Sequence, residues 1–113
     1  MYNKYHAKKT AIDNIVFDSK REATRYQELK LLEKAGLITD LKLQPKFILQ
    51  VGFTYEDEKV RPITYIGDFQ YTDVESGKEI VEDVKGVKTK EFLIKRKLFL
   101  AKYGQQYTFK MVK

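Results

Sequence analysis

The segment Val81-Glu82-Asp83-Val84-Lys85-Gly86 decides how this chain is interpreted. Its apolar positions and closing glycine predict a short β-strand. Side chains two residues apart in a strand point to the same face, so Asp83 and Lys85 are expected about 6–7 Å apart on one surface of a sheet. Such a pair is most often a surface ion pair of small energetic value. A second acid, Asp68, lies fifteen residues before Asp83. Its presence suggests a chemical role for the Asp83–Lys85 pair.

A lysine beside two carboxylates suits the metal-assisted hydrolysis of a phosphodiester bond. The carboxylates can hold Mg²⁺, and the lysine can steer a water molecule and offset the charge that develops on the phosphate. The first hypothesis is therefore a nuclease whose site contains Asp68, Asp83 and Lys85.

The apolar pattern on both sides of this segment predicts one α/β domain in the order α-β-β-β-α-β, with a four-stranded mixed sheet flanked by two helices. The expected elements are an extended piece at Ile12–Phe17, helices at Lys20–Ala35 and Lys90–Tyr103, and strands at Lys46–Phe53, Arg61–Thr72, Glu79–Lys85 and Gln106–Val112. Polar turns are expected at Thr54–Lys59 and Asp73–Lys78.

The proposed site depends on how the second and third of these strands pair. If Glu75–Lys78 forms a four-residue loop, Asp68 lies opposite Lys85, and both share a face with Asp83. A loop of three or five residues would shift the register by one and move Asp68 to the other face. The sequence does not choose between these loops.

Glu22 has two interpretations. Ser19-Lys20-Arg21-Glu22 has the form of a capping box, in which the Glu22 carboxylate only caps the helix. Glu22 also lies near the middle of the helix face that carries Ala23, Tyr26 and Leu29, and a carboxylate on a buried face is explained by a metal site.

The last predicted helix is apolar almost all the way round, which is typical of a helix buried on two sides, within the domain or between subunits. Five lysines are candidates for contacts with nucleic-acid phosphates. Two belong to a basic, aromatic N-terminal arm at residues 1–10, and three lie at or near the last helix: Lys8, Lys9, Lys88, Lys90 and Lys95.

Composition narrows the chemistry further. The chain has 113 residues, no cysteine and one histidine, His6, so a metal would bind oxygen ligands, as Mg²⁺ or Mn²⁺ does. The 22 Lys and Arg against 16 Asp and Glu give a net charge of +6, which favours a polyanionic partner and above all nucleic acid. No signal peptide or membrane-spanning run is apparent, so we expect a cytoplasmic protein with no membrane partner.

Several segments in order resemble a family of small bacteriophage and prophage proteins in the PD-(D/E)xK nuclease superfamily. They are Lys4–Lys9, Phe17–Ala23, Leu43–Phe47, Tyr65–Phe69 and Val81–Gly86. The resemblance covers nearly the whole chain. Gly67 stands where the superfamily name has proline, at a position that varies within the superfamily.

The resemblance implies a restriction-endonuclease-like domain with metal-dependent endonuclease activity on DNA. Asp68 and Asp83 would bind the metal, with Glu22 as a direct or water-bridged ligand and the Val84 carbonyl as a further ligand. Lys85 would position the attacking water.

A homodimer that cuts two strands is a reasonable expectation, and branched recombination intermediates such as Holliday junctions are one candidate substrate. The alternative from another class is a non-catalytic DNA-binding accessory protein of a bacteriophage that retains the fold. Action on RNA remains a third reading, because charge and aromatic content do not separate the two nucleic acids.

Overall fold

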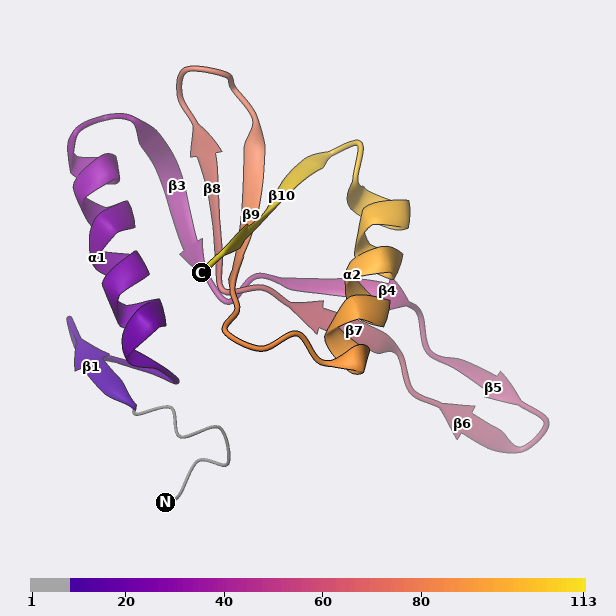
Figure 1. The fold of residues 1–113 in the computed structure, drawn as a ribbon. Coiled ribbons are helices and arrows are strands. Elements are labelled where there is room, and N and C mark those ends of the chain that lie inside the picture. Colours follow the sequence, from indigo (N-terminus) through magenta and orange to yellow (C-terminus); the bar gives the residue numbers. More distant parts are fainter. Residues whose placement is uncertain (1–8) are drawn as a thin grey trace.

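The computed structural model describes residues 9–113 (Figure 1). Two helices, α1 (Lys20–Lys34) and α2 (Lys90–Tyr103), lie in a chain that is otherwise made of short strands. The strands are β1 (Thr10–Ile12), β2 (Ile15–Phe17), β3 (Ile38–Leu43), β4 (Lys46–Gln50), β5 (Phe53–Tyr55), β6 (Glu58–Val60), β7 (Ile63–Ile66), β8 (Phe69–Asp73), β9 (Glu79–Val84) and β10 (Tyr107–Val112).

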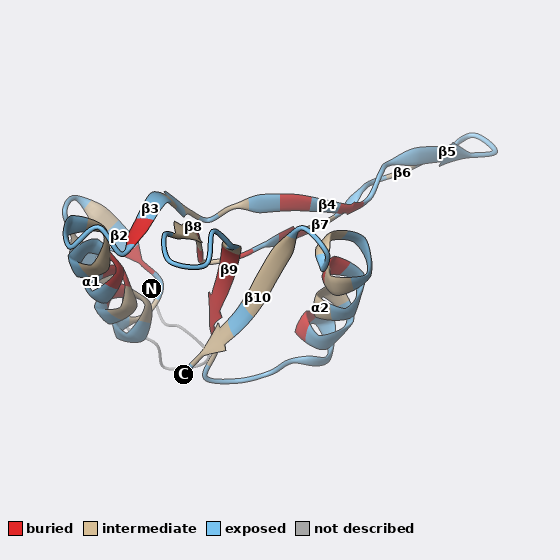
Figure 2. Ribbon diagram, turned by 90° about the horizontal axis from the view of Figure 1, so that it is seen from above, coloured by how far each residue is buried: buried red, intermediate tan, exposed pale blue. Residues whose placement is uncertain are grey.

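The central sheet has four strands in the order β10-β9-β8-β3. β10 runs parallel to β9, whereas the β9–β8 and β8–β3 pairs are antiparallel. The sheet is therefore mixed, as predicted, and the two helices lie on opposite sides of it (Figure 2). The α/β class and the four-stranded mixed sheet are confirmed.

The fourth strand of this sheet is not the one predicted. The sequence analysis used Lys46–Phe53, but the sheet edge is β3, for which no strand was predicted. β3 is interrupted by an irregularity between Thr39 and Lys42, where Asp40 has φ 56°. A residue in the left-handed region breaks the two-residue alternation by which a strand is found in a sequence.

The predicted strands Lys46–Phe53 and Arg61–Thr72 each divide into two. Their outer parts leave the central sheet and form a ribbon, in which β4 pairs with β7 and β5 pairs with β6. The second of these predicted strands breaks at Gly67 and Asp68, between β7 and β8. This break places Asp68 at the point where the chain passes from the ribbon to the sheet.

The predicted extended piece Ile12–Phe17 proves to be part of a hairpin of β1 and β2. Its two turn residues, Asp13 and Asn14, have φ 53° and 64°, as a type I′ turn requires. The tight turn reverses the chain, and Ile12, Ile15 and Phe17 then pack with α1.

Two apolar cores cover the two faces of the sheet. The first lies under α1 and includes Ile80 and Val84 of β9 together with Phe69 of β8. The second lies under α2 and includes Val81 of β9. Alternate residues of β9 thus face different helices, as the pleat of a strand requires.

No helix of the described part of the chain is long and apolar enough to cross a membrane.

Candidate functional site

The β8–β9 hairpin brings the predicted acids together in a register that differs from the predicted one. Thr72 pairs with Glu79 and Phe69 pairs with Glu82, so the loop contains six residues, Asp73–Lys78, rather than four. The paired residues end at Phe69 and Glu82, so the ladder stops one residue short of Asp68. The backbone N–H of Asp68 donates to the carbonyl of Glu82 at 2.9 Å. Asp68 is therefore held against Glu82 rather than opposite Lys85, and its carboxylate is near enough to Asp83 for the Asp83 charge to raise its pKa.

The Asp68 carboxylate is held by the backbone of β9. Its Oδ2 accepts a hydrogen bond from the N–H of Val84 at 2.6 Å. The N–H and C=O of one residue in a strand point toward the same neighbouring strand, so the Val84 carbonyl is directed to the side where Asp68 lies. Asp68 is half-buried, and its second oxygen has no hydrogen-bond partner among the contacts of the described residues.

The surroundings of Gly67 explain why a glycine stands at this position. Its N–H donates to the carbonyl of Pro45 at 2.9 Å, a bond that a proline could not make. A Cβ at this position would lie 3.1 Å from Cγ1 of Val81, so even a small side chain would press on the core. The glycine lets the chain turn from β7 into Asp68 while remaining packed on β9.

Asp83 is the most buried carboxylate of the candidate site. The Tyr65 hydroxyl donates to Oδ2, while Oδ1 is buried and has no hydrogen-bond donor. The Lys85 Nζ lies 3.6 Å from that free oxygen and 4.7 Å from the centre of the Phe92 ring. Asp83 and Lys85 therefore lie side by side, as the strand pattern predicted, with a buried oxygen that is available to a cation.

Glu22 enters the site from the first turn of α1. The predicted N-cap is present, because Ser19 Oγ accepts the N–H of Glu22 at 3.1 Å. The reciprocal bond of a capping box, from the Ser19 N–H to the Glu22 carboxylate, is not made among the described residues. The carboxylate instead lines a cavity of about 130 Å³ together with Asp68.

Burial and neighbouring negative charge perturb two of these carboxylates, those of Asp68 and Glu22. Burial, followed by the charges of Asp83 and Glu22, raises the pKa of Asp68 to about 8. Burial, followed by the charges of Asp18 and Asp83, raises the pKa of Glu22. Lys85 acts in the opposite direction on both groups without cancelling the effect. A cluster with this sign of charge is stabilised by a bound cation.

The residues fit a divalent cation in part. Asp68, Asp83 and the Val84 carbonyl present oxygen atoms, which are the ligands of Mg²⁺ and Mn²⁺. Within residues 9–113, however, no three His, Cys, Asp or Glu side chains are grouped closely enough to surround an ion as they stand. A cation at this place would rely on two carboxylates, the backbone carbonyl and water, with Glu22 reached through a water or by a rotation of its side chain.

The predicted phosphate-binding lysines differ in how near they lie to Asp83 and Lys85. Lys95 lines a cleft of about 240 Å³ together with Asp83 and Lys85, and its Nζ lies 3.9 Å from Glu91. Lys88 and Lys90 are exposed beside this cleft, at the start of α2. Lys9 is exposed before β1, and Lys8, with most of the N-terminal arm, lies outside the described residues.

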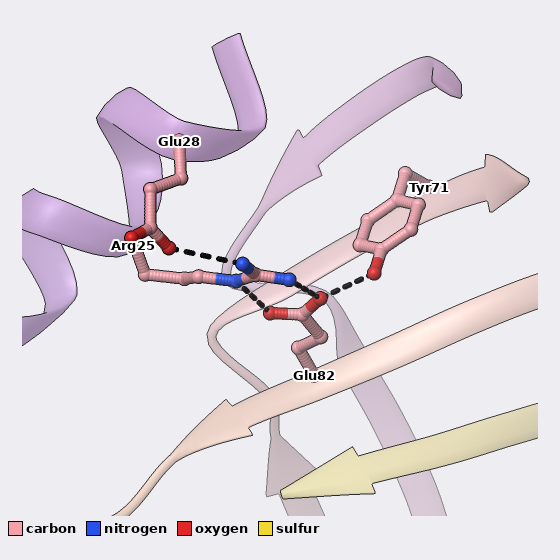
Figure 3. A network of polar contacts seen from close by, with 4 residues as sticks. All are labelled: Arg25, Glu28, Tyr71 and Glu82. Atoms are coloured by element: carbon pink, nitrogen blue, oxygen red, sulfur yellow. Dashed lines mark hydrogen bonds and ion pairs between the residues drawn. The ribbon is translucent and has the colours of Figure 1, made fainter. Parts of the chain in front are cut away.

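A buried ion-pair network behind the site was not predicted (Figure 3). Glu82 is completely buried, and its carboxylate receives Arg25 Nε at 2.8 Å and Nη2 at 2.7 Å. The Tyr71 hydroxyl donates to the same carboxylate, and Arg25 also pairs with Glu28 at 3.0 Å. Arg25 follows Glu22 by almost one helical turn, and Glu82 precedes Asp83. The network therefore holds α1 against β9 next to Glu22 and Asp83.

Sequence reasoning missed Tyr65, Arg25 and Glu82. The alternation of β9 does signal that Glu82 faces away from Asp83, toward the helix that carries Arg25. Nothing local signals Tyr65, because the break at Gly67 disrupts the parity that would relate it to Asp68.

Comparison with known protein families identifies the family to which the chain belongs. A sequence model described as "Protein of unknown function (DUF1064)" matches residues 2–113. No curated protein and no solved structure matches the chain.

Proposed function

The chain belongs to the DUF1064 family, and we propose that it is a metal-dependent nuclease that hydrolyses phosphodiester bonds of DNA. The proposal includes membership of the PD-(D/E)xK superfamily and action in the cytoplasm of a bacterial host on behalf of a phage or prophage. It rests on the resemblance of the segments around Glu22, Asp68 and Asp83, and on the geometry of those residues.

The observation that carries the proposal is the buried Oδ1 of Asp83. It has no hydrogen-bond donor, and it lies near a second carboxylate, Asp68, whose pKa is raised by burial and then by like charge. A buried carboxylate oxygen without a hydrogen bond is costly even with the Lys85 ammonium 3.6 Å away, so it calls for an explanation. Binding a divalent cation is the use that also explains the neighbouring Asp68.

Each residue has a part in such a reaction. A bound Mg²⁺ or Mn²⁺ would supply Lewis acidity toward the phosphate and a water of lowered pKa. Asp68 and Asp83 would hold the ion, and the Val84 N–H would keep the Asp68 carboxylate in place. Lys85, fixed between Asp83 and Phe92, would orient the attacking water and stabilise negative charge on the phosphate.

DNA is supported by the charge of the protein and by its distribution. The net charge is +6, and Lys88, Lys90 and Lys95 lie beside the cleft that contains Asp83 and Lys85. A duplex or branched DNA could contact these lysines through its phosphates while one phosphodiester reaches the acids. A Holliday junction requires two cuts, and two copies of the chain would supply two sites.

A specific observation favours the second candidate, a DNA-binding accessory protein without catalytic activity. The described residues contain no group of three side chains arranged to hold an ion. A binding protein would keep the lysines and would have no need of a metal.

A cleavage panel separates the two candidates. Linear, nicked, flapped and four-way DNA, and a single-stranded RNA, are incubated with Mg²⁺, Mn²⁺ or EDTA. We expect metal-dependent cleavage of DNA that is lost in Asp68→Asn and Asp83→Asn and retained in Glu75→Gln, which changes an exposed acid of the β8–β9 loop. Binding of DNA with no cleavage under any metal would establish the accessory protein instead.

A further inference from the structure

The ribbon beyond the central sheet ends in an arm, residues 51–62, which contains β5 and β6. These two strands form a sheet of their own, and no other helix or strand of the described chain packs closely on them. Figures 1 and 2 both show the arm projecting from the body of the protein. An isolated two-stranded hairpin is marginally stable in water, which indicates that this one has a surface to lie against.

The arm carries apolar side chains along its length and acids at its tip. Val51, Phe53 and Tyr55 are exposed by 64%, 46% and 62%. The tip is Glu56-Asp57-Glu58. Three consecutive carboxylates repel DNA phosphates, so the occupant of this surface is a protein with an apolar and basic face.

The same chain offers such a face on α2. Phe92 and Phe99 are buried on the inner side of this helix, against the ribbon and the sheet. Ile94 and Leu98, on the outer side, are exposed by 60% and 38%. Successive turns of an α-helix place Lys90 and Lys97 beside this apolar stripe. The sequence predicted a helix buried on two sides, and the described protomer buries only one.

We propose that the arm of one copy packs along the outer face of α2 in a second copy. Val51, Phe53 and Tyr55 would cover Ile94 and Leu98, and the acidic tip would meet the two lysines. The sizes agree, because the five residues from Val51 to Tyr55 span about 17 Å when extended and the fourteen residues of α2 span about 21 Å.

The position of the arm favours a closed pair over a chain of subunits. β4 and β7, which form the base of the arm, pack on the inner side of α2, so the arm leaves the protomer beside the helix it would cover in its partner. A two-fold axis near this junction gives two equivalent arm–helix contacts that adjoin each other. The dimer does not rest on the nuclease chemistry, although it would set two candidate sites in one particle.

Sedimentation equilibrium of the full chain tests the proposal, with charge reversal as the perturbation. One variant carries Glu56→Lys, Asp57→Lys and Glu58→Lys, and the other carries Lys90→Glu and Lys97→Glu. In a homodimer of either variant, like charges face each other at both arm–helix contacts. We therefore expect the dimer dissociation constant to rise at least about tenfold. All five positions are exposed, so the melting temperature of the monomer serves as the check on folding.

Mixing the two variants provides the decisive arm of the experiment. Each acidic surface then meets a basic one, and a heterodimer should form with about the affinity of the wild type. Leu31→Lys, at an exposed apolar residue of α1, is the matched control and should leave the dimer unchanged. A monomeric wild type, or a dimer that is insensitive to both charge reversals, would overturn the proposal, as would a failure of the mixture to associate.

Discussion

Replacing Asp68 by asparagine should stabilise the metal-free protein even though it removes a candidate metal ligand. The amide oxygen can still accept the N–H of Val84, whereas the repulsion from Asp83 and Glu22 disappears. Stabilisation by the loss of this charge is expected because burial, followed by the charges of Asp83 and Glu22, disfavours the ionised carboxylate, and a bound cation would offset that penalty.

The magnitude follows from the pKa of Asp68, which rises from 3.8 to about 8. Between these two pKa values the unfolded chain is ionised while the folded protein keeps the proton, so stability falls by about 1.4 kcal/mol per pH unit above 3.8, or about 4 kcal/mol at pH 7 in a rigid protein. Relaxation of the neighbouring side chains and solvent reduce this value, so we expect a gain of about 1–3 kcal/mol in the free energy of unfolding. In a domain of this size that gain raises the melting temperature by roughly 4–12 °C.

The sign of the pH dependence is also determined. The carboxyl of Asp68 loses its proton near pH 4 in the unfolded chain and near pH 8 in the folded one, so the wild type loses stability as the pH rises through this window. The asparagine variant lacks this loss. The difference in melting temperature should be close to zero at pH 4 and largest at pH 8.

Thermal melts in EDTA across this pH range, followed by melts in excess Mg²⁺ or Mn²⁺, make the measurement. Metal at about one hundred times its dissociation constant should stabilise the wild type by about 3 kcal/mol and the variant much less. Asp73→Asn is the control, since hydrogen bonds from Ser76 lower the pKa of this acid and no gain is expected. If Asp68→Asn melts at or below the wild-type temperature at pH 8 without metal, the repulsion argument is refuted.

Three further changes test the parts of the site. Lys85→Ala should reduce the single-turnover cleavage rate by about 10²–10³-fold, while the metal-induced shift in melting temperature remains. A rate within about threefold of wild type would leave Lys85 as a simple ion-pair partner of Asp83. Glu22→Gln keeps the backbone N–H that Ser19 caps, so its melting temperature should stay within a few degrees while cleavage is mostly lost; full activity would remove Glu22 from the site. Arg25→Met leaves the buried Glu82 carboxylate without its cation and should lower the free energy of unfolding by about 3–5 kcal/mol in urea titrations. A loss below about 1 kcal/mol would show that the ion pair contributes little to stability.

The sequence alone was sufficient wherever a structure depends on neighbouring residues. Ser19 and Gly36 mark the ends of α1 because capping bonds and a positive φ are local, and α2 occupies the predicted range for the same reason. The placement of Asp83 and Lys85 on one face follows from the two-residue repeat of a strand. The predicted pairing of Asp68 with Lys85 did not follow in the same way, because the β8–β9 loop has six residues rather than four and the backbone N–H of Asp68 bonds to the carbonyl of Glu82.

Only the tertiary structure decided which strands pair and what surrounds each acid. β3 replaced the predicted fourth strand because strand pairing is selected by contacts between distant segments, which the alternation of a single segment does not encode. The Tyr65 hydroxyl reaches Asp83 only because the chain changes sheets at Gly67, and Arg25 reaches Glu82 across 57 residues of sequence. Burial then turned ordinary carboxylates into mutually repelling ones, since the energy of a charge depends on the water and the charges that folding leaves around it.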